Sequence, residues 1–369
     1  MKIVLLGDVG LFGKFCIRNG LKPESYFSDF IDKTKSCDFV IGNLETPFTK
    51  SFKEHSAKSA YIGSFEENIE AIKALGISHV NLANNHTGDF GIEGYSLTKK
   101  VLDDNGIKYF GIEARKEFLD FDGNRICFSG FCNMDSNPVF LSDPEKINDL
   151  GVNIADADKI IEGLSNSSDL GYLNILAFHS GLEHVNLPGR ADICFARYLA
   201  QHFDYVLYGH HPHVVQAYEK VNKSHLFYSL GNFCFDDVYS NVSKKPLVKM
   251  TEDNKLGLAP ILTIENNIIE NVEYLWTYLG AEKMEILEND NFEIIKTIKN
   301  LDLSDLDKVE RERNEFLSKW LTARKGSRDL NWYLKRLRVR YIKLLFNSKK
   351  NRKLYEKHYL NKLKNINII

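Results

Sequence analysis

The sequence predicts a layered α/β domain followed by an α-helical C-terminal region. In the first part, short apolar runs end in polar clusters, and helical patterns lie between the first few of them. The character changes after about Gly280: Ala281–Lys364 contains one glycine and no proline, and shows long helical periodicity. We therefore expect two units, residues 1–280 and residues 281–369.

Composition limits the class of protein. The chain has 369 residues, of which 43% are hydrophobic and 27% charged, so it can bury a large core and is not a disordered chain. Its six cysteines contain no CxxC pair and are expected to be reduced core residues. The net charge is −2, but Arg311–Ile369 holds 18 Lys and Arg against 4 Asp and Glu, a net of +14 that leaves −16 on the rest. An acidic body thus carries a basic tail.

The predicted strands are short runs rich in Val, Ile, Leu, Phe and Tyr. They are Lys2–Leu6, Phe39–Ile41, His79–Leu82, Ile126–Phe131, Leu173–Phe178, Tyr205–Tyr208, Leu226–Leu230, Ala259–Glu265 and Ile269–Tyr274. Helical patterns cover Tyr26–Lys35, Phe65–Leu75 and Ile92–Asp104. In α/β folds, functional sites assemble at the carboxyl ends of strands.

Polar residues able to bind a metal follow five of these strands. They are Asp8, Asn43 or Glu45, Asn85-His86, His179, and His211 with His213. Oxygen and imidazole donors together suit divalent Mn, Fe or Zn. The set is large enough for one or two ions, and a pair about 3.5–4 Å apart would stabilise the attacking and leaving oxygens of phosphoester hydrolysis.

The order of these motifs resembles the CapA family, proteins associated with poly-γ-glutamate capsule synthesis, within the calcineurin-like metallophosphoesterase superfamily. The resemblance covers residues 1–275. It rests on Gly7-Asp8, Gly42-Asn43-Leu44-Glu45, Asn84-Asn85-His86 with Asp89-Phe90-Gly91, His179-Ser180-Gly181, Gly209-His210-His211-Pro212-His213 with Gln216, and Ser229-Leu230-Gly231-Asn232-Phe233. The resemblance implies a metallophosphatase-like αββα sandwich with two central sheets.

The resemblance also implies a role for each residue of the site. The implied metal ligands are Asp8, Glu45, Asn85, His179, His211 and His213, with Glu45 as the bridging or near-bridging carboxylate. His86 would be the catalytic acid, and Asp89 would orient its imidazole. Asn43 could bind metal directly or only support the site, and His210 and Asn232 are expected to support it.

The sequence departs from the superfamily pattern at two positions. Gly10 stands where the D-x-H motif has its histidine, and Asn43 stands where the second motif has an aspartate. Two equally occupied metal sites are therefore not assured, and one tight and one weak ion are an expected outcome. The start Gly7–Lys14 is not a phosphate loop, because five residues separate its outer glycines and Phe15 follows the lysine.

Three site residues also have ordinary structural interpretations. Asn43 could simply form a turn, Glu45 before Thr46-Pro47 could lie in a surface loop, and His179 could be a satisfied core histidine.

The basic C-terminal helices have three possible roles. An apolar stripe is predicted at Leu330, Leu334, Leu337, Tyr341, Leu344 and Leu345. This stripe could pack on the body, or the helices could contact an anionic membrane surface or an envelope-synthesis partner. Nucleic acid is not expected as a partner, because the acidic body would repel phosphates.

We expect a metal-dependent hydrolase of CapA type that serves capsule or other cell-surface polymer synthesis. A metal-bound hydroxide would attack an anionic or polymer-precursor substrate, most simply a phosphoester, with an amide or isopeptide bond also open. The alternative is a non-hydrolytic accessory subunit of a synthesis or export complex. The apolar run in the start MKIVLLGD is too short for a signal peptide, and no run of about 18 apolar residues occurs. We therefore expect a cytoplasmic protein, either free or peripheral to the membrane.

Overall fold

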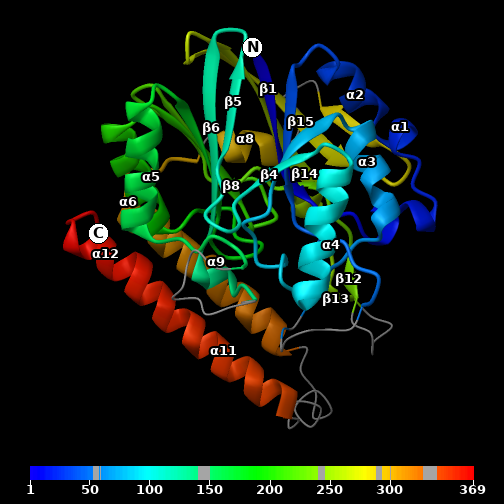
Figure 1. Ribbon diagram of the computed structural model, residues 1–369. Coiled ribbons are helices and arrows are strands. Elements are labelled where there is room, and N and C mark those ends of the chain that lie inside the picture. Colours follow the sequence, from blue (N-terminus) through cyan, green and yellow to red (C-terminus); the bar gives the residue numbers. More distant parts are fainter. Residues whose placement is uncertain are drawn as a thin grey trace.

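A computed structural model describes residues 1–52, 58, 60–139, 150–239, 246–287, 293–299, 301–326 and 339–369. Two β-sheets pack face to face in the centre, and helices cover both outer faces (Figure 1). This arrangement confirms the layered αββα sandwich and the helical C-terminal region that the sequence predicts.

The first sheet has the strand order β16-β15-β14-β1-β2-β3-β4, with β11 also paired to β1. Its strands are β1 (Lys2–Val9), β2 (Phe39–Leu44), β3 (Ile77–Asn81), β4 (Lys108–Phe110), β11 (Asn232–Cys234), β14 (Leu256–Glu265), β15 (Ile268–Leu279) and β16 (Met284–Leu287). Strands β1 to β4 run parallel, so all four end at the same edge of the sheet.

The second sheet has the order β5-β6-β7-β8-β10-β9. Its strands are β5 (Glu117–Phe121), β6 (Asn124–Cys132), β7 (Leu173–His179), β8 (Tyr205–His210), β9 (Tyr218–Val221) and β10 (Ser224–Phe227). Strands β6, β7, β8 and β10 are parallel. A separate small hairpin joins β12 (Val238–Tyr239) and β13 (Pro246–Val248).

The helices bury one apolar face each against a sheet. Helices α1 (Pro23–Tyr26), α2 (Ser28–Thr34), α3 (Ile69–Ala74) and α4 (Gly91–Asp104) cover the first sheet, and α5 (Ala157–Asp169) and α6 (Arg190–His202) cover the second (Figure 1). In α6, Ile193, Ala196, Leu199 and Ala200 recur at the three- and four-residue spacing of a helix face and are buried. The Asp156 side chain caps α5 by accepting from Lys159 N.

Two predicted elements differ from the structure. The run Leu226–Leu230 is not one strand: β10 ends at Phe227, and the chain leaves the second sheet to join the first as β11. Tyr228 O lies 1.9 Å from where a Cβ of residue 209 would stand, so only glycine fits at position 209. The helix predicted over Tyr26–Lys35 is interrupted at Phe27.

An apolar layer and one tyrosine join the two sheets. Ile3, Leu5 and Ile41 of the first sheet share a fully buried cluster with side chains of β7 and β8. Tyr208 in β8 crosses this layer, and its hydroxyl shares a hydrogen bond between the carbonyls of Leu6 and Ile41, the latter at 3.1 Å. The relative position of the sheets, and thus of the polar residues at their edges, is fixed by these contacts.

The residues beyond 280 pack on the same body. Strand β16 extends the first sheet, and Ile295 and Ile298 of α8 (Glu293–Lys299) are buried in the inter-sheet cluster. Tyr359 and Leu363, from the π-helical turn η5 (Glu356–Leu360) and from α12 (Asn361–Asn365), are buried over the second sheet. The division near residue 280 stays a prediction.

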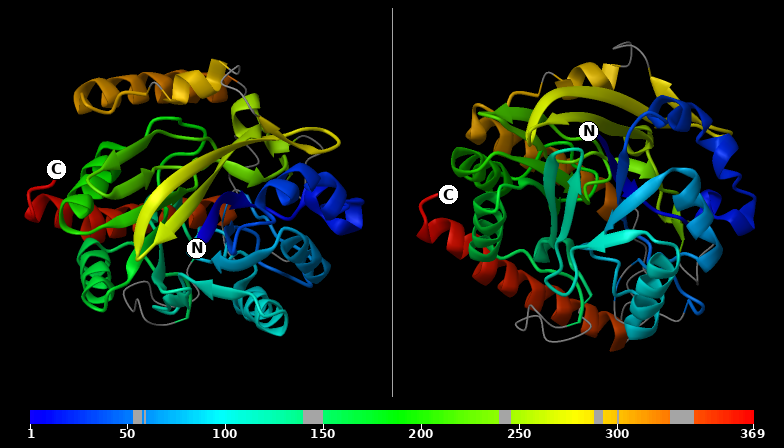
Figure 2. Two further views of the ribbon diagram at one scale, coloured as in Figure 1. Left: turned by 90° about the horizontal axis from the view of Figure 1, so that it is seen from above. Right: turned by 45° about the horizontal axis from the view of Figure 1, so that its top comes forward.

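Helices α9 (Leu306–Gly326) and α11 (Val339–Tyr355) lie on different sides of the body, as the view from above shows (Figure 2). Of the predicted apolar stripe, Leu330, Leu334, Leu337 and the side chain of Tyr341 lie outside the described residues; Leu344 is half-buried and Leu345 is exposed. None of the helices in the described ranges combines the length and the apolar character needed to cross a bilayer.

The fold predicts that Tyr208→Phe destabilises the protein by about 1–3 kcal/mol, because two buried carbonyls lose their shared donor without any change in packing. Urea unfolding of wild type and variant measures this difference. The matched control is Tyr239→Phe, whose ring is 54% exposed and which should change the free energy of unfolding by less than about 0.5 kcal/mol. Equal effects of the two substitutions would contradict the prediction.

Candidate metal centre

The first sheet contributes a hydrogen-bonded row of side chains at the carboxyl ends of its strands. Asp8, Asn43 and Asn81 are register neighbours on β1, β2 and β3. Asn81 Nδ2 donates to Asn43 Oδ1 at 2.9 Å, and Asn43 Nδ2 donates to Asp8 Oδ1 at 2.8 Å. The amide oxygen of Asn43 is therefore occupied, and this residue holds Asp8 in place.

The second sheet contributes the histidines. His179 ends β7 and His210 ends β8, and they are register partners. The chain then turns sharply: His211 has φ 95° and His213 has φ 57°, in the left-handed region that side chains other than glycine rarely adopt. Such strain is typical of sites where the surrounding structure imposes the conformation.

Glu45 lies where the two sets meet. The described residues include two groups of three buried side chains that could hold a metal ion. Within each group, one donor atom from each residue lies within 4.8 Å of the other two. The first group is Glu45, His179 and His211, and the second group is Asp8, Glu45 and His213. Glu45 Oε1 lies 3.8 Å from His179 Nε2 and 3.7 Å from His213 Nε2, so this carboxylate joins the two groups. The surface-loop interpretation of Glu45 is wrong, since the side chain is fully buried.

Burial and the neighbouring charges shift the pKa values of both carboxyls and of His213. For Glu45, burial and then the nearby Asp8 raise the pKa well above its usual range. For Asp8, burial acts upward, but the nearby imidazoles of His210 and His213 outweigh it and hold the pKa well below its usual range. For His213, burial acts downward, but Glu45 and Asp8 raise the pKa to about 10. Without a metal, a His213 cation thus balances Asp8.

The donors fit a divalent cation. Both Glu45 oxygens, His179 Nδ1 and His211 Nδ1 are buried and have no hydrogen-bond partner among the described residues. For a carboxylate this is costly unless a cation compensates it. Asn85 Oδ1 lies 3.1 Å from His179 Nε2, so the predicted amide ligand is in the same place. Carboxylate, amide and imidazole donors suit Mn, Fe or Zn.

His86 and Asp89 are joined to a lysine that the sequence analysis missed. His86 Nδ1 lies 2.6 Å from Asp89 Oδ2. The buried Lys58 Nζ donates to Asp89 Oδ1 at 2.9 Å and to Asn85 O at 2.7 Å, and lies 3.2 Å from His86 Nδ1. For His86, burial and then Lys58 lower the pKa. For Asp89, burial acts upward, but Lys58 and His86 outweigh it and lower the pKa.

The three supporting residues contact the predicted ligands. Asn43 bonds to Asp8, and Asn232 Oδ1 lies 2.9 Å from His213 Nδ1. His210 Nδ1 lies 3.4 Å from Asp8 Oδ1, which makes it a direct neighbour of the second group. The exposed Glu183, which the sequence analysis also missed, interacts electrostatically with His211 and His213. Its only sequence signal was its place four residues after His179.

The space beside Gly10, where the superfamily has a histidine, is filled by aromatic rings. A Cβ at position 10 would lie 2.7 Å from the Phe235 ring and 2.9 Å from the Phe12 ring. The Phe235 ring in turn lies 4.5 Å, centroid to centroid, from His213. The second group therefore has an apolar wall at this position and no further ligand from residue 10.

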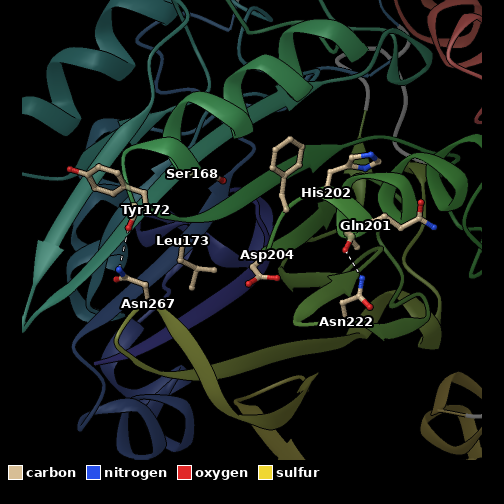
Figure 3. A pocket seen from close by; sticks show the side chains of 11 residues that line it. Ser168, Tyr172, Leu173, Gln201, His202, Asp204, Asn222 and Asn267 are labelled. Atoms are coloured by element: carbon tan, nitrogen blue, oxygen red, sulfur yellow. Dashed lines mark hydrogen bonds between the residues drawn. The ribbon is translucent and has the colours of Figure 1, made fainter.

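A separate cavity of about 390 Å³ lies at the opposite edge of the second sheet (Figure 3). Leu173 at the start of β7 and Asp204 just before β8 line it, together with Tyr172, Asn222 and Asn267. Asn267 donates to Gly171 O and Asn222 to Ala200 O, so these amides are used within the fold. The cavity is remote from His179 and His210, which end the same two strands.

Comparison with known proteins gives a family and several relatives. Residues 2–237 match the family model described as bacterial capsule synthesis protein PGA_cap. The PGA biosynthesis protein CapA of Bacillus subtilis is 30% identical over 224 residues, 58% of each chain. The capsule biosynthesis protein CapA of Bacillus anthracis is 28% identical over 282 residues, 72% of this chain and 67% of that protein. This chain thus spans about three fifths to two thirds of those relatives.

Among solved structures, the sulfate thiohydrolase SoxB of Thermus thermophilus in complex with glycerol superposes with a TM-score of 0.41. It is 11% identical, and the match covers 75% of this chain and 45% of that one.

The shared carboxylate predicts that Glu45→Gln weakens metal binding in both groups at once, by about 10- to 100-fold, because the amide loses the charge and one acceptor. Calorimetric titration with Mn²⁺, together with the metal content of protein purified without chelator, measures this. Asn85→Ala and His211→Ala should also lose metal. The control His202→Ala removes an exposed imidazole and should bind like wild type. Full metal content in the Asn85 and His211 variants would refute the ligand assignment.

The buried ion pair predicts that Lys58→Met destabilises the protein by about 3–5 kcal/mol, because Asp89 loses its ammonium partner. Urea unfolding of the single variants and of Lys58→Met/Asp89→Asn tests this as a double-mutant cycle. The double variant should cost less than the sum of the single variants, since neither charge is left alone. Additive costs would show that the two groups are not coupled.

Proposed function

We propose a function from one premise: this chain belongs to the bacterial capsule synthesis protein family PGA_cap. We infer that it is a metal-dependent hydrolase that acts in the synthesis or modification of a capsule or another cell-surface polymer. The observation that carries this proposal is the fully buried Glu45 carboxylate, which is shared by two groups of candidate metal ligands and accepts no hydrogen bond from the part of the chain that the structure describes.

A bound divalent ion, or a pair of them, would supply the part of the chemistry that this chain does not provide: activation of water at neutral pH and stabilisation of negative charge on the reacting oxygens. Asp8, Glu45, Asn85, His179, His211 and His213 would hold it. The carboxylate and imidazole donors lie at the carboxyl ends of strands of both sheets, so the fold sets their positions before any substrate binds.

His86 is proposed as the acid that protonates the leaving group. Asp89 lies against Nδ1 of its imidazole and fixes this nitrogen as the internal donor, which leaves Nε2 to take or give a proton. Burial and Lys58 lower the pKa of His86, so a proton held there is released readily. Asp89 and Lys58 act through His86 and are positioning residues.

A phosphoester is the proposed substrate class. Hydrolysis of a phosphoester develops negative charge on both the attacking and the leaving oxygen, and a site that binds cations at two adjoining groups can stabilise both. Hydrolysis of an amide or isopeptide bond in a polymer precursor would develop only one oxyanion, and would therefore need only one of the two groups of candidate metal ligands.

We expect His86→Ala to lower kcat for p-nitrophenyl phosphodiester or monoester hydrolysis by about 10²- to 10⁴-fold, the usual contribution of a general acid, with metal content unchanged. The assay uses full-length protein with added Mn²⁺, and chelator should abolish the wild-type rate. His202→Ala is the control. Unchanged activity in the His86 variant would remove its role. Metal binding by wild type without hydrolysis of phosphoester or amide substrates would favour a non-hydrolytic accessory subunit.

A further inference from the structure

Helix α11 presents a basic outer face that carries two exposed apolar side chains. Leu345 is 64% exposed and Phe346 is 70% exposed, the highest values among the large apolar side chains described. Val339–Tyr355 contains six Lys and Arg and no Asp or Glu. Lys349, Lys350 and Lys353 are exposed, and none of them forms an ion pair within the described part of the chain.

The opposite face of α11 is held firmly by the body. Asn351 Nδ2 donates to Asn137 Oδ1 at 2.6 Å, and Leu354 is buried with Met134 and Ile154. At the helical repeat of 100° per residue, Phe346, Lys349 and Lys353 lie on one side and Asn351 and Leu354 on the other. The helix therefore keeps a fixed orientation, with Phe346 and the lysines directed away from the protein.

We propose that α11 docks the protein on an anionic lipid bilayer, with Leu345 and Phe346 inserted among the headgroups and the lysines paired with lipid charges. A helix that combines basic residues with exposed Phe and Leu is suited to the boundary between headgroups and acyl chains. Lysines close to an anionic surface add electrostatic attraction that salt weakens.

Two other occupants fit the face less well. A second copy of the chain would bring two helices of charge +6 together without an acidic residue on either to offset them. Nucleic acid would satisfy the lysines, but it offers no apolar phase for Leu345 and Phe346, and the body preceding Arg311 carries a net charge of −16.

The position of α11 relates the bilayer to the metal centre. Helix α11 packs on the 3-10 helix η4 (Met134–Ser136), which follows the carboxyl end of β6. Ser136 O accepts a hydrogen bond from Asn85 Nδ2 at 3.1 Å. A docked α11 would thus hold the bilayer on the side of the molecule where the strands that carry the site end (Figure 1).

The test is co-sedimentation of the full-length protein with vesicles of phosphatidylcholine alone or with 30% phosphatidylglycerol, at low and high salt. We expect binding only to the anionic vesicles, and at least tenfold weaker binding at about 0.5 M salt. Lys349→Glu/Lys350→Glu/Lys353→Glu and, separately, Leu345→Ser/Phe346→Ser should each weaken binding at least tenfold. Circular dichroism checks that both variants are folded.

Matched controls make the same changes elsewhere on the surface. Lys22→Glu/Lys108→Glu/Lys220→Glu changes the net charge equally, and Leu170→Ser/Leu247→Ser removes two exposed apolar side chains. Both should bind vesicles like wild type. Equal loss in the controls, or unchanged binding of the α11 variants, would overturn the proposal. A third result would also overturn it: a short DNA duplex competes with the vesicles, and the Leu345→Ser/Phe346→Ser variant still binds them fully. The lysines would then form a general site for polyanions rather than a lipid-binding face.

Discussion

The burial of two carboxylates side by side is the constraint on which this structure depends. Asp8 and Glu45 are both fully buried, and each makes ionisation of the other more costly. The charge of Asp8 is compensated by hydrogen bonds from the Asn43 side chain and the His211 backbone N–H, and by the nearby imidazoles of His210 and His213. Glu45 accepts no hydrogen bond within the described part of the chain, and its Oε1 lies 3.7 Å from His213 Nε2. A buried carboxylate in this state lowers stability unless a cation is bound beside it, so these residues are suited to a bound cation.

The rest of the fold brings donors from two sheets to that carboxylate. Parallel strands deliver Asp8 and Asn43 from one sheet and His179 from the other. Tyr208 joins the two sheets through the carbonyls of Leu6 and Ile41, which lie two residues before Asp8 and Asn43 respectively. The left-handed backbone at His211 and His213 carries a local cost, and the close backbone packing around position 209 holds the turn that imposes it.

Much of the fold and most of the candidate site could be predicted from the sequence, because both follow from local rules. Apolar runs ending in polar residues place side chains at strand ends, and parallel strands end together, which is how Asp8, Glu45, Asn85 and His179 are found without a structure. Lys58 could not be found, because its burial against Asp89 depends on where a long connection folds back. Nothing local shows that β10 ends at Phe227 or that a ring fills the space beside Gly10.

The two donor groups are chemically unequal, and the inequality originates in the first sheet. A cation at the first group would meet His179 and His211, two buried imidazoles whose pKa values are lowered by burial, so that both are neutral and available as ligands. A cation at the second group must compete with the hydrogen bonds of Asp8 and with the proton of His213, whose pKa is raised to about 10. The Phe235 ring also occupies the space beside Gly10 where a further ligand could lie. Asn43 and Gly10, the two departures from the superfamily pattern, thus both lie beside the second group, where we expect a cation to bind more weakly than at the first.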